Sequence, residues 1–174
     1  MKIILETERL ILREYTAEDF GALYAIVGDA ETMKHFPKPY DERGTKYWIS
    51  WSEDHYKNHG FGFWAVILKE TGELVGNCGL TMQNIDGEQL PEVGYHINKA
   101  YWRQGIAKEA AAAVRDWAFR NTSYPAVYSY MTKENEASVK TAASMGMKKT
   151  GEYTDDHYGD MLVYRITREE WEEL

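Results

Sequence analysis

The stretch that most constrains this chain is an apolar strand pattern that leads through a basic, glycine-containing turn directly into an alanine-rich helix pattern. It runs from Pro91 to Ala113 and reads PEVGYHINKAYWRQGIAKEAAAA. The first turn of a helix has backbone N–H groups without intrahelical partners, and the helix dipole adds partial positive charge there. This arrangement predicts a site for an anion, above all for phosphate groups.

Five residues around the turn suit an anionic ligand. Arg103, Gln104 and Lys108 provide side-chain donors. Gly105 has no Cβ, so a ligand can approach the backbone closely. Ala107 has only a small side chain, so the next turn of the helix also leaves room for a ligand. An ordinary strand-to-helix connection with solubilising charges is the alternative that these residues alone leave open.

The spacing of the turn narrows the choice of ligand. The chain contains neither the G-x-G-x-x-G pattern of dinucleotide-binding turns nor the G-x-x-x-x-G-K-[ST] pattern of P-loops. The segment 102–107, WRQGIA, resembles instead the pyrophosphate-binding motif Q/R-x-x-G-x-G/A of the GNAT superfamily of acetyltransferases. The resemblance implies that acetyl-coenzyme A (acetyl-CoA) is bound by Arg103, Gln104, Gly105, Ile106, Ala107 and Lys108.

Three further segments support this resemblance. The opening ETERLILR, residues 6–13, and EVGYHI, residues 92–97, are similar to the branch that includes the ribosomal-protein N-terminal acetyltransferases, the Rim group. Asn135 and Ser138, followed by MGM at residues 145–147, match a later motif of the superfamily. The match implies that Asn135 and Ser138 hydrogen-bond the pantetheine or thiol end of the cofactor, although simple helix capping also explains both residues.

Composition limits the class of protein. The chain has 174 residues, 44% of them apolar, and we expect a single domain over residues 1–174. Cys78 is the only cysteine, and no N-terminal apolar run is long enough for a signal peptide or a membrane helix. We therefore expect a cytoplasmic protein that binds no membrane. The net charge of −8 argues against nucleic-acid binding and mildly favours cationic acceptors such as amines.

Residue patterns predict a mixed α/β fold with hairpins and one parallel crossover. We expect strands over 9–14, 61–68, 74–82, 91–97, 127–132, 147–153 and 161–167. We expect helices over 16–28, 41–60, 108–121 and 135–145, with short helical turns at 31–36 and after Thr167. Residues 83–90 read as a long loop. The resemblance implies the GNAT fold, an α+β arrangement with a mixed, mostly antiparallel sheet of about seven strands flanked by helices.

Acyl transfer to an amine needs a base, and Glu92 is the first candidate. A carboxylate at a partly buried strand end can have its pKa raised toward neutrality, whereas an exposed sheet-edge glutamate is equally consistent with the sequence. The resemblance favours the base, acting directly or through a water. His96 is a second candidate, although a lone strand histidine is more often a packed residue.

Strand periodicity places Glu92, Gly94 and His96 on one face of their strand and the intervening residues on the other. Members of the superfamily typically have a bulge in this strand, and Gly94 makes one plausible here. The resemblance then implies that backbone N–H groups of Tyr95, His96 or Ile97 polarise the thioester carbonyl. Tyr95 and Ile97 are accordingly counted with the cofactor-binding residues.

The general acid is not identified. Many members of the superfamily have a tyrosine seven residues after the motif asparagine, and that position here is Ala142. A thiolate leaves readily without strong acid assistance, because the pKa of a free thiol is only about 8.5. Cys78 suggests a covalent acetyl-enzyme as a weaker alternative. No cluster of His, Asp and Cys has metal-ligand spacing, so we expect no metal.

The acceptor is the least determined part. Five aromatic residues either line an acceptor groove or belong to the core: Trp48, Trp51, Phe61, Phe63 and Trp64. Glu53 and Asp54 either attract an ammonium group or form a solvated helix face. The reading that best fits the resemblance is an N-acetyltransferase that moves acetyl directly to a peptide N-terminus or small amine in a ternary complex. The alternative is a non-catalytic acetyl-CoA-binding or partner-binding module. Either a monomer or a homodimer is compatible with the sequence.

Overall fold

The computed structural model describes all 174 residues, which form eight strands, five α-helices and two short 3-10 turns. The strands are β1 (Ile3–Glu6), β2 (Leu10–Arg13), β3 (Phe63–Leu68), β4 (Leu74–Ile85), β5 (Glu88–Ile97), β6 (Ala126–Thr132), β7 (Lys148–Asp155) and β8 (Gly159–Thr167). The helices are α1 (Phe20–Val27), α2 (Glu42–His59), α3 (Ile106–Asn121), α4 (Glu136–Ser144) and α5 (Arg168–Glu172), with 3-10 turns at Ala17–Asp19 and Lys99–Tyr101.

The strands form one sheet in the order β1-β2-β3-β4-β5-β6-β8-β7. Every neighbouring pair is antiparallel except β5 and β6, which α3 connects as a parallel crossover. The mixed, mostly antiparallel sheet is therefore confirmed, with eight strands rather than seven. The extra strand is β1, which ends at Glu6 and is followed, after a turn, by β2 at the position of the strand expected over 9–14.

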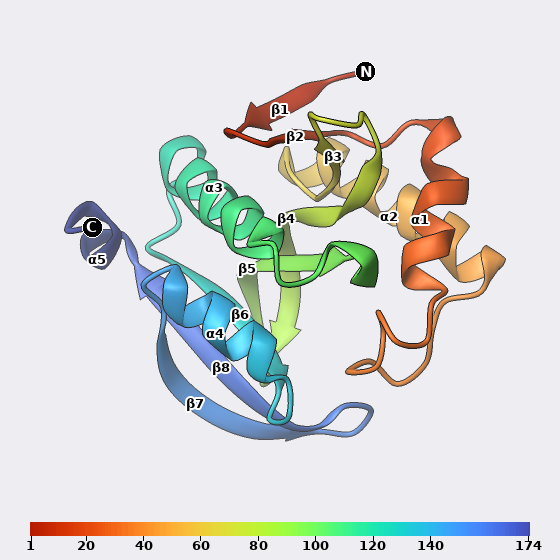
Figure 1. Ribbon diagram of the computed structural model, residues 1–174. Coiled ribbons are helices and arrows are strands. Elements are labelled where there is room, and N and C mark those ends of the chain that lie inside the picture. Colours follow the sequence, from red (N-terminus) through yellow and green to blue (C-terminus); the bar gives the residue numbers. More distant parts are fainter.

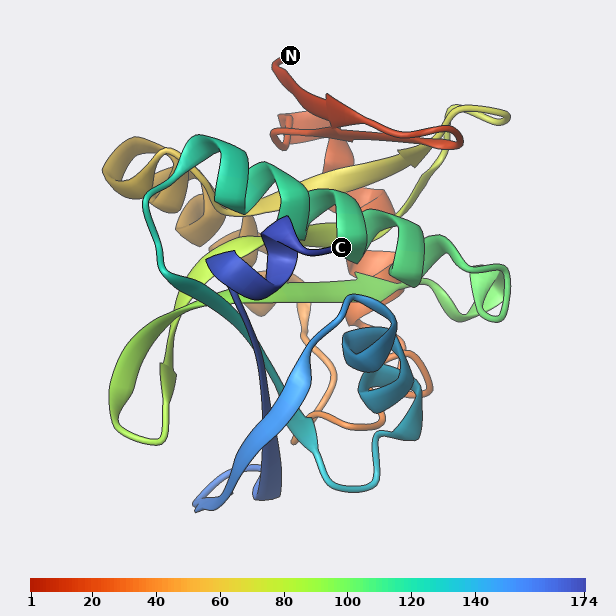
Figure 2. The same cartoon turned by 90° about the vertical axis from the view of Figure 1, so that its left-hand side faces the viewer.

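Helices cover both faces of the sheet. Helices α3 and α4 lie on one face, and α1 and α2 lie on the other (Figures 1 and 2). Strand β3 is buried along its whole length because it is covered from both sides: Trp64 and Val66 belong to the core under α3, and Phe63 and Ala65 belong to the core under α1 and α2. No helix combines the length and the apolar character that a membrane crossing demands.

The expected helix boundaries follow from capping residues. The Asp41 side chain accepts a hydrogen bond from the backbone of Gly44 at the start of α2, and Gly60 ends that helix with a φ of 78°. Asn135 likewise accepts from the backbone of Ser138 at the start of α4. Residues 31–36 form the expected short turn with i→i+3 and i→i+4 hydrogen bonds, and Pro37 and Pro39 stop it from developing into a longer helix.

The expected long loop at residues 83–90 is wrong. Strands β4 and β5 continue in register to the pair Ile85 and Glu88, and only Asp86 and Gly87 lie between them. Both turn residues have positive φ, 51° and 84°, as a two-residue hairpin turn of the Asp-Gly type requires. This segment is thus a paired hairpin rather than a loop that could close over a substrate.

Strands β5 and β6 diverge after a single paired position. Glu92 and Tyr128 are the one registered pair, and Figure 2 shows β6 running obliquely away from β5. The expected bulge at Gly94 is absent, because β4 and β5 stay in unbroken register from Gly76 and Ile97 to Ile85 and Glu88. The opening in the sheet therefore comes from the direction of β6, and the expected alternation of side chains along β5 is preserved.

Candidate active site

The turn before α3 has the geometry of an anion site. Gly105 is the N-cap of this 16-residue helix with a φ of 75°, and no side chain caps the helix there. The backbone N–H groups of Ile106, Ala107 and Lys108 donate to no protein side chain and are available to phosphate oxygens. Arg103 also has a positive φ, 61°, which is uncommon for a non-glycine residue.

The predicted cofactor-binding residues of this turn differ in their exposure to solvent. Arg103, Gln104, Gly105 and Lys108 are exposed, whereas the side chain of Ile106 is buried in the core, so Ile106 can offer a ligand only its backbone. A Cβ on Gly105 would meet only Arg9 Nη2, at 3.5 Å. The turn therefore presents donors and open space, which fits a pyrophosphate group.

A clamp from the N-terminal hairpin holds this turn, and the sequence reasoning missed it. Arg9 donates through Nε to Glu109 Oε2 at 2.6 Å and through Nη1 to the Gln104 carbonyl at 2.8 Å. Thr7 Oγ1 and the Arg9 backbone N–H both donate to Glu109 Oε1. Burial opposes ionisation of Glu109, but these hydrogen bonds outweigh it and lower the pKa of its carboxyl. We call Thr7, Arg9 and Glu109 the N-terminal clamp.

A cavity of about 320 Å³ occupies the opening between β5 and β6. Its walls include side chains from both faces of β5, Glu92 and His96 on one and Val93 and Tyr95 on the other. The cavity therefore passes through the sheet, from the face of α3 and α4 to the face of α1 and α2. The remaining walls come mainly from β6, from α4, and from α2 and the segment before it, with single residues from β3, β4, β8 and the β7–β8 turn.

Glu92 lies in the wall of this cavity and is 8% exposed. Its Oε2 accepts a hydrogen bond from Thr81 Oγ1 at 3.3 Å across the β4–β5 pair. Burial raises the pKa of Glu92 to about 8, and the Thr81 hydrogen bond offsets only part of this effect. A Cβ on Gly94 would lie 2.8 Å from Glu92 Oε2, so the glycine makes room for this carboxyl group.

His96 occupies the same face of β5 and is buried to a similar extent, 9% exposed. Its Nδ1 lies 3.0 Å from Asn77 Oδ1, and its Nε2 is buried without a partner. Burial lowers the pKa of His96 to about 3, so the imidazole is neutral at physiological pH. Of the two predicted bases, Glu92 has the pKa closer to neutrality and is the better proton acceptor.

Strand β5 and helix α4 bring the predicted cofactor residues Tyr95, Asn135 and Ser138 together in the cavity wall. Tyr95 donates through its hydroxyl to Ser138 Oγ at 3.1 Å. Ala142, where many members of the superfamily have a tyrosine, is also in this wall. The structure thus places a tyrosine hydroxyl beside α4 after all, supplied by the neighbouring strand. Ile97 is 5% exposed and belongs to the core, so only its backbone could take part.

Several other sequence candidates lie outside the cavity. Cys78 is fully buried in the core, and burial raises the pKa of its thiol, so no reactive thiolate forms near neutral pH. Glu53 and Asp54 are exposed on α2, and Phe61 and Trp64 are core residues. Of the five aromatic residues considered as an acceptor groove, those in the cavity wall are Trp48, Trp51 and Phe63. No group of three or more His, Cys, Asp or Glu side chains could hold a metal ion.

Known proteins match this chain in sequence and in fold. Residues 9–148 match the family described as the acetyltransferase (GNAT) domain. The uncharacterized protein YkkB of Bacillus subtilis is 31% identical, with 84% of this chain and 86% of that protein covered. The uncharacterized N-acetyltransferase YnaD of Bacillus subtilis is 27% identical, with 96% and 98% covered.

A solved structure shows the same architecture. The crystal structure of an acetyltransferase of the GNAT family from Bacillus anthracis superimposes with a TM-score of 0.80 at 26% identity, covering 97% of this chain and 99% of that one. The family match includes the turn at the start of α3, the strand that carries Glu92 and the start of α4. The chain is therefore an acyltransferase and belongs to the GNAT acetyltransferase family.

Proposed function

We propose that this protein is an N-acetyltransferase that moves an acetyl group from acetyl-CoA directly to a primary amine, on a peptide N-terminus or a small molecule, in a ternary complex. The observation that carries the proposal is Glu92, a buried carboxyl group with a pKa near 8 in the wall of a cavity that opens to both faces of the sheet. This geometry gives the cofactor and the acceptor separate approaches to one base.

The cofactor approaches from the face of α3 and α4. Arg103, Gln104 and Lys108 and the first-turn backbone N–H groups hold the pyrophosphate, and the N-terminal clamp fixes that turn. Tyr95, Asn135 and Ser138 line the path toward the opening in the sheet. Backbone N–H groups of β5 polarise the carbonyl to be attacked. Bound acetyl-CoA supplies the acetyl group already activated as a thioester.

Glu92 provides the base at the acceptor side. An amine arrives as an ammonium ion, and the ionised Glu92 takes one proton, directly or through a water, so that the nitrogen lone pair is free. The nitrogen then forms a bond to the acetyl carbon while the carbon–sulfur bond breaks. The second amine proton neutralises the leaving thiolate, and the proton held by Glu92 returns to solvent. The buried Cys78 thiol is not used.

The resemblance of two sequence motifs supports a more specific assignment within the GNAT family. We propose the Rim-type branch from the motifs at residues 6–13 and 92–97, and a cytoplasmic protein with one acetyltransferase domain over residues 1–174. The non-catalytic alternative rested on the missing tyrosine at residue 142. The Tyr95 hydroxyl beside α4 weakens that argument, since the cavity retains a tyrosine.

The proposal is tested by titration calorimetry with acetyl-CoA, coenzyme A and ATP, followed by a thiol-release assay with peptide N-termini and small amines. We expect acetyl-CoA to bind and ATP to bind much more weakly, and we expect amine-dependent thiol release. Acetyl-CoA binding without turnover of any amine would contradict the assigned reaction. Absence of acetyl-CoA binding would contradict the cofactor site as well.

A further inference from the structure

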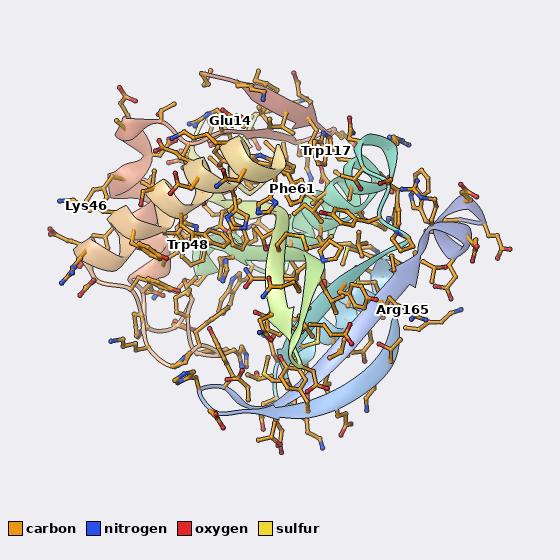
Figure 3. All side chains as sticks on the ribbon, turned by 180° about the vertical axis from the view of Figure 1, so that it is seen from behind. Glu14, Lys46, Trp48, Phe61, Trp117 and Arg165 are labelled. Atoms are coloured by element: carbon orange, nitrogen blue, oxygen red, sulfur yellow. The ribbon has the colours of Figure 1, made fainter.

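Aromatic side chains form most of the cavity wall on the face of α1 and α2. Trp48 and Trp51 come from α2, Phe36 from the segment before it and Phe63 from β3. Figure 3 labels Trp48, which points from α2 toward the strands. Four tyrosines complete the aromatic wall, two from α2 and the segment before it, one from β6 and one from the β7–β8 turn: Tyr40, Tyr47, Tyr130 and Tyr158. Segments far apart in the chain thus contribute flat rings to one space.

These rings are arranged around His96. Its ring centroid lies 4.8 Å from that of Phe36, 4.9 Å from that of Trp48 and 5.7 Å from that of Phe63. The Trp48 ring also meets Tyr40 nearly edge to face, with centroids 5.1 Å apart. Edge-to-face and tilted arrangements are those that aromatic rings favour, so a further ring can be accepted in the same way.

The charge in this wall is limited to one group. Glu92 is the only carboxyl group among the lining residues, and no lysine or arginine is among them. The histidines of the wall, His35 and His96, both have their pKa lowered by burial and are neutral near pH 7. In its ionised form Glu92 is a partner for one ammonium group of a ligand, whereas a carboxylate or a second ammonium would be desolvated without an opposite charge.

The size of the cavity favours a compact acceptor. Its volume of about 320 Å³ lies at the lower end of the range for small-molecule sites, and the transferred acetyl group must share it. A bulky polyhydroxylated amine does not suit this space. A single ring on a short amine-bearing chain does.

We propose that the acceptor is a compact aromatic monoamine without a carboxylate, of the arylalkylamine class, whose ring packs against the aromatic side chains that surround His96 and whose amine faces Glu92. This inference rests on the proposed acetyl transfer to an amine and specifies its acceptor. Polyamines, free amino acids and aminoglycosides are then poor acceptors, because each carries charge that this wall leaves unpaired.

Matched amines test the proposal in the thiol-release assay with the full chain and saturating acetyl-CoA. The probes are 2-phenylethylamine, phenylalaninamide, phenylalanine, spermidine and a short peptide with a serine N-terminus. We expect 2-phenylethylamine and phenylalaninamide to be acetylated, and phenylalanine to have a kcat/KM lower by roughly a hundredfold, since its carboxylate is buried unpaired. A higher kcat/KM for spermidine, phenylalanine or the serine peptide than for 2-phenylethylamine would overturn the proposal while leaving acetyl transfer intact.

A binding measurement separates this inference from the reaction itself. Because Trp48 and Trp51 are in the wall, 2-phenylethylamine should change the tryptophan fluorescence in a saturable way even if no turnover occurs. Phe36→Ala should raise the KM for 2-phenylethylamine roughly tenfold and leave acetyl-CoA affinity unchanged. Phe20→Ala, which changes an aromatic residue stacked on Tyr24 outside the cavity, is the matched control. No fluorescence change, or equal effects of the two variants, would overturn the proposal.

Discussion

Arg9 and Glu109 are 100 residues apart in sequence, yet the Arg9 Nε and Glu109 Oε2 atoms lie 2.6 Å apart and join the N-terminal hairpin to the first turn of α3. The same guanidinium holds the carbonyl of Gln104 in the turn that we assign to the pyrophosphate. The first residues of the chain thereby help to shape the proposed cofactor site in its middle.

Arg9→Ala is expected to weaken acetyl-CoA binding without removing a group that touches the reacting atoms. The clamp is partly exposed, so we expect a roughly threefold to tenfold rise in the KM for acetyl-CoA, with the acceptor KM unchanged. Steady-state kinetics with each substrate varied would measure this. Lys2→Ala, which removes the neighbouring Lys2–Glu14 ion pair of the same hairpin, is the control and should change neither constant.

Gly105→Val is expected to abolish tight acetyl-CoA binding. A β-branched residue is strained at a φ of 75°, and its side chain would fill the approach to the helix N-terminus. Gly72→Val is a matched control, because Gly72 has a φ of 73° in the β3–β4 turn, with nothing near its missing Cβ. Calorimetry should show at least roughly a tenfold loss of affinity for the first variant alone. Equal losses in both would mean that strain, not the site, is responsible.

Glu92→Gln is expected to lower kcat by roughly a hundredfold to a thousandfold, the usual effect of removing a general base. Because the pKa of Glu92 is about 8, the wild-type rate should rise with pH up to that value and then level off. The variant should lose this dependence, and Glu88→Gln, an exposed change on the same strand, should keep it. A rise that persists in Glu92→Gln would belong to the acceptor ammonium and would contradict the assignment.

The same carboxyl group should make stability depend on pH. Its pKa is about 8 in the folded chain against 4.5 for an ordinary glutamate, so the folded state holds the proton more tightly. The free energy of unfolding therefore falls as the pH rises from about 4.5 to about 8. Thermal unfolding should show that Glu92→Gln gains Tm relative to wild type at pH 9 but not at pH 4. A Tm difference that is the same at both values would show that Glu92 ionises as freely as an exposed group.

Sequence patterns correctly predicted the features that are fixed by residues close together in the chain. Asp41, Gly60 and Asn135 end or begin their helices as expected, because caps satisfy backbone groups within one turn. Alternation along β5 placed Glu92 and His96 on one face. The hairpin at Asp86 was missed because polar residues next to a turn resemble a loop until their cross-strand partners are known.

Relationships across the sheet could not be predicted in this way. Glu109 looks like an ordinary helix-surface residue in the sequence, and only the folded hairpin shows that Thr7 and Arg9 bind it. Tyr95 was assigned from its backbone, whereas its hydroxyl reaches Ser138 on another element. The opening at Gly94 was attributed to a local bulge, but it arises because β6 leaves β5 after one pair.

The cavity that passes through the sheet has an evolutionary consequence. The residues that we assign to the cofactor lie on the side of α3 and α4, and the aromatic wall lies on the side of α2. Substitutions in that wall can therefore alter acceptor preference while the cofactor turn and its clamp remain intact. A lineage built on this plan can diversify its acceptors by changing a few side chains on one side of the sheet, with the donor half inherited unchanged.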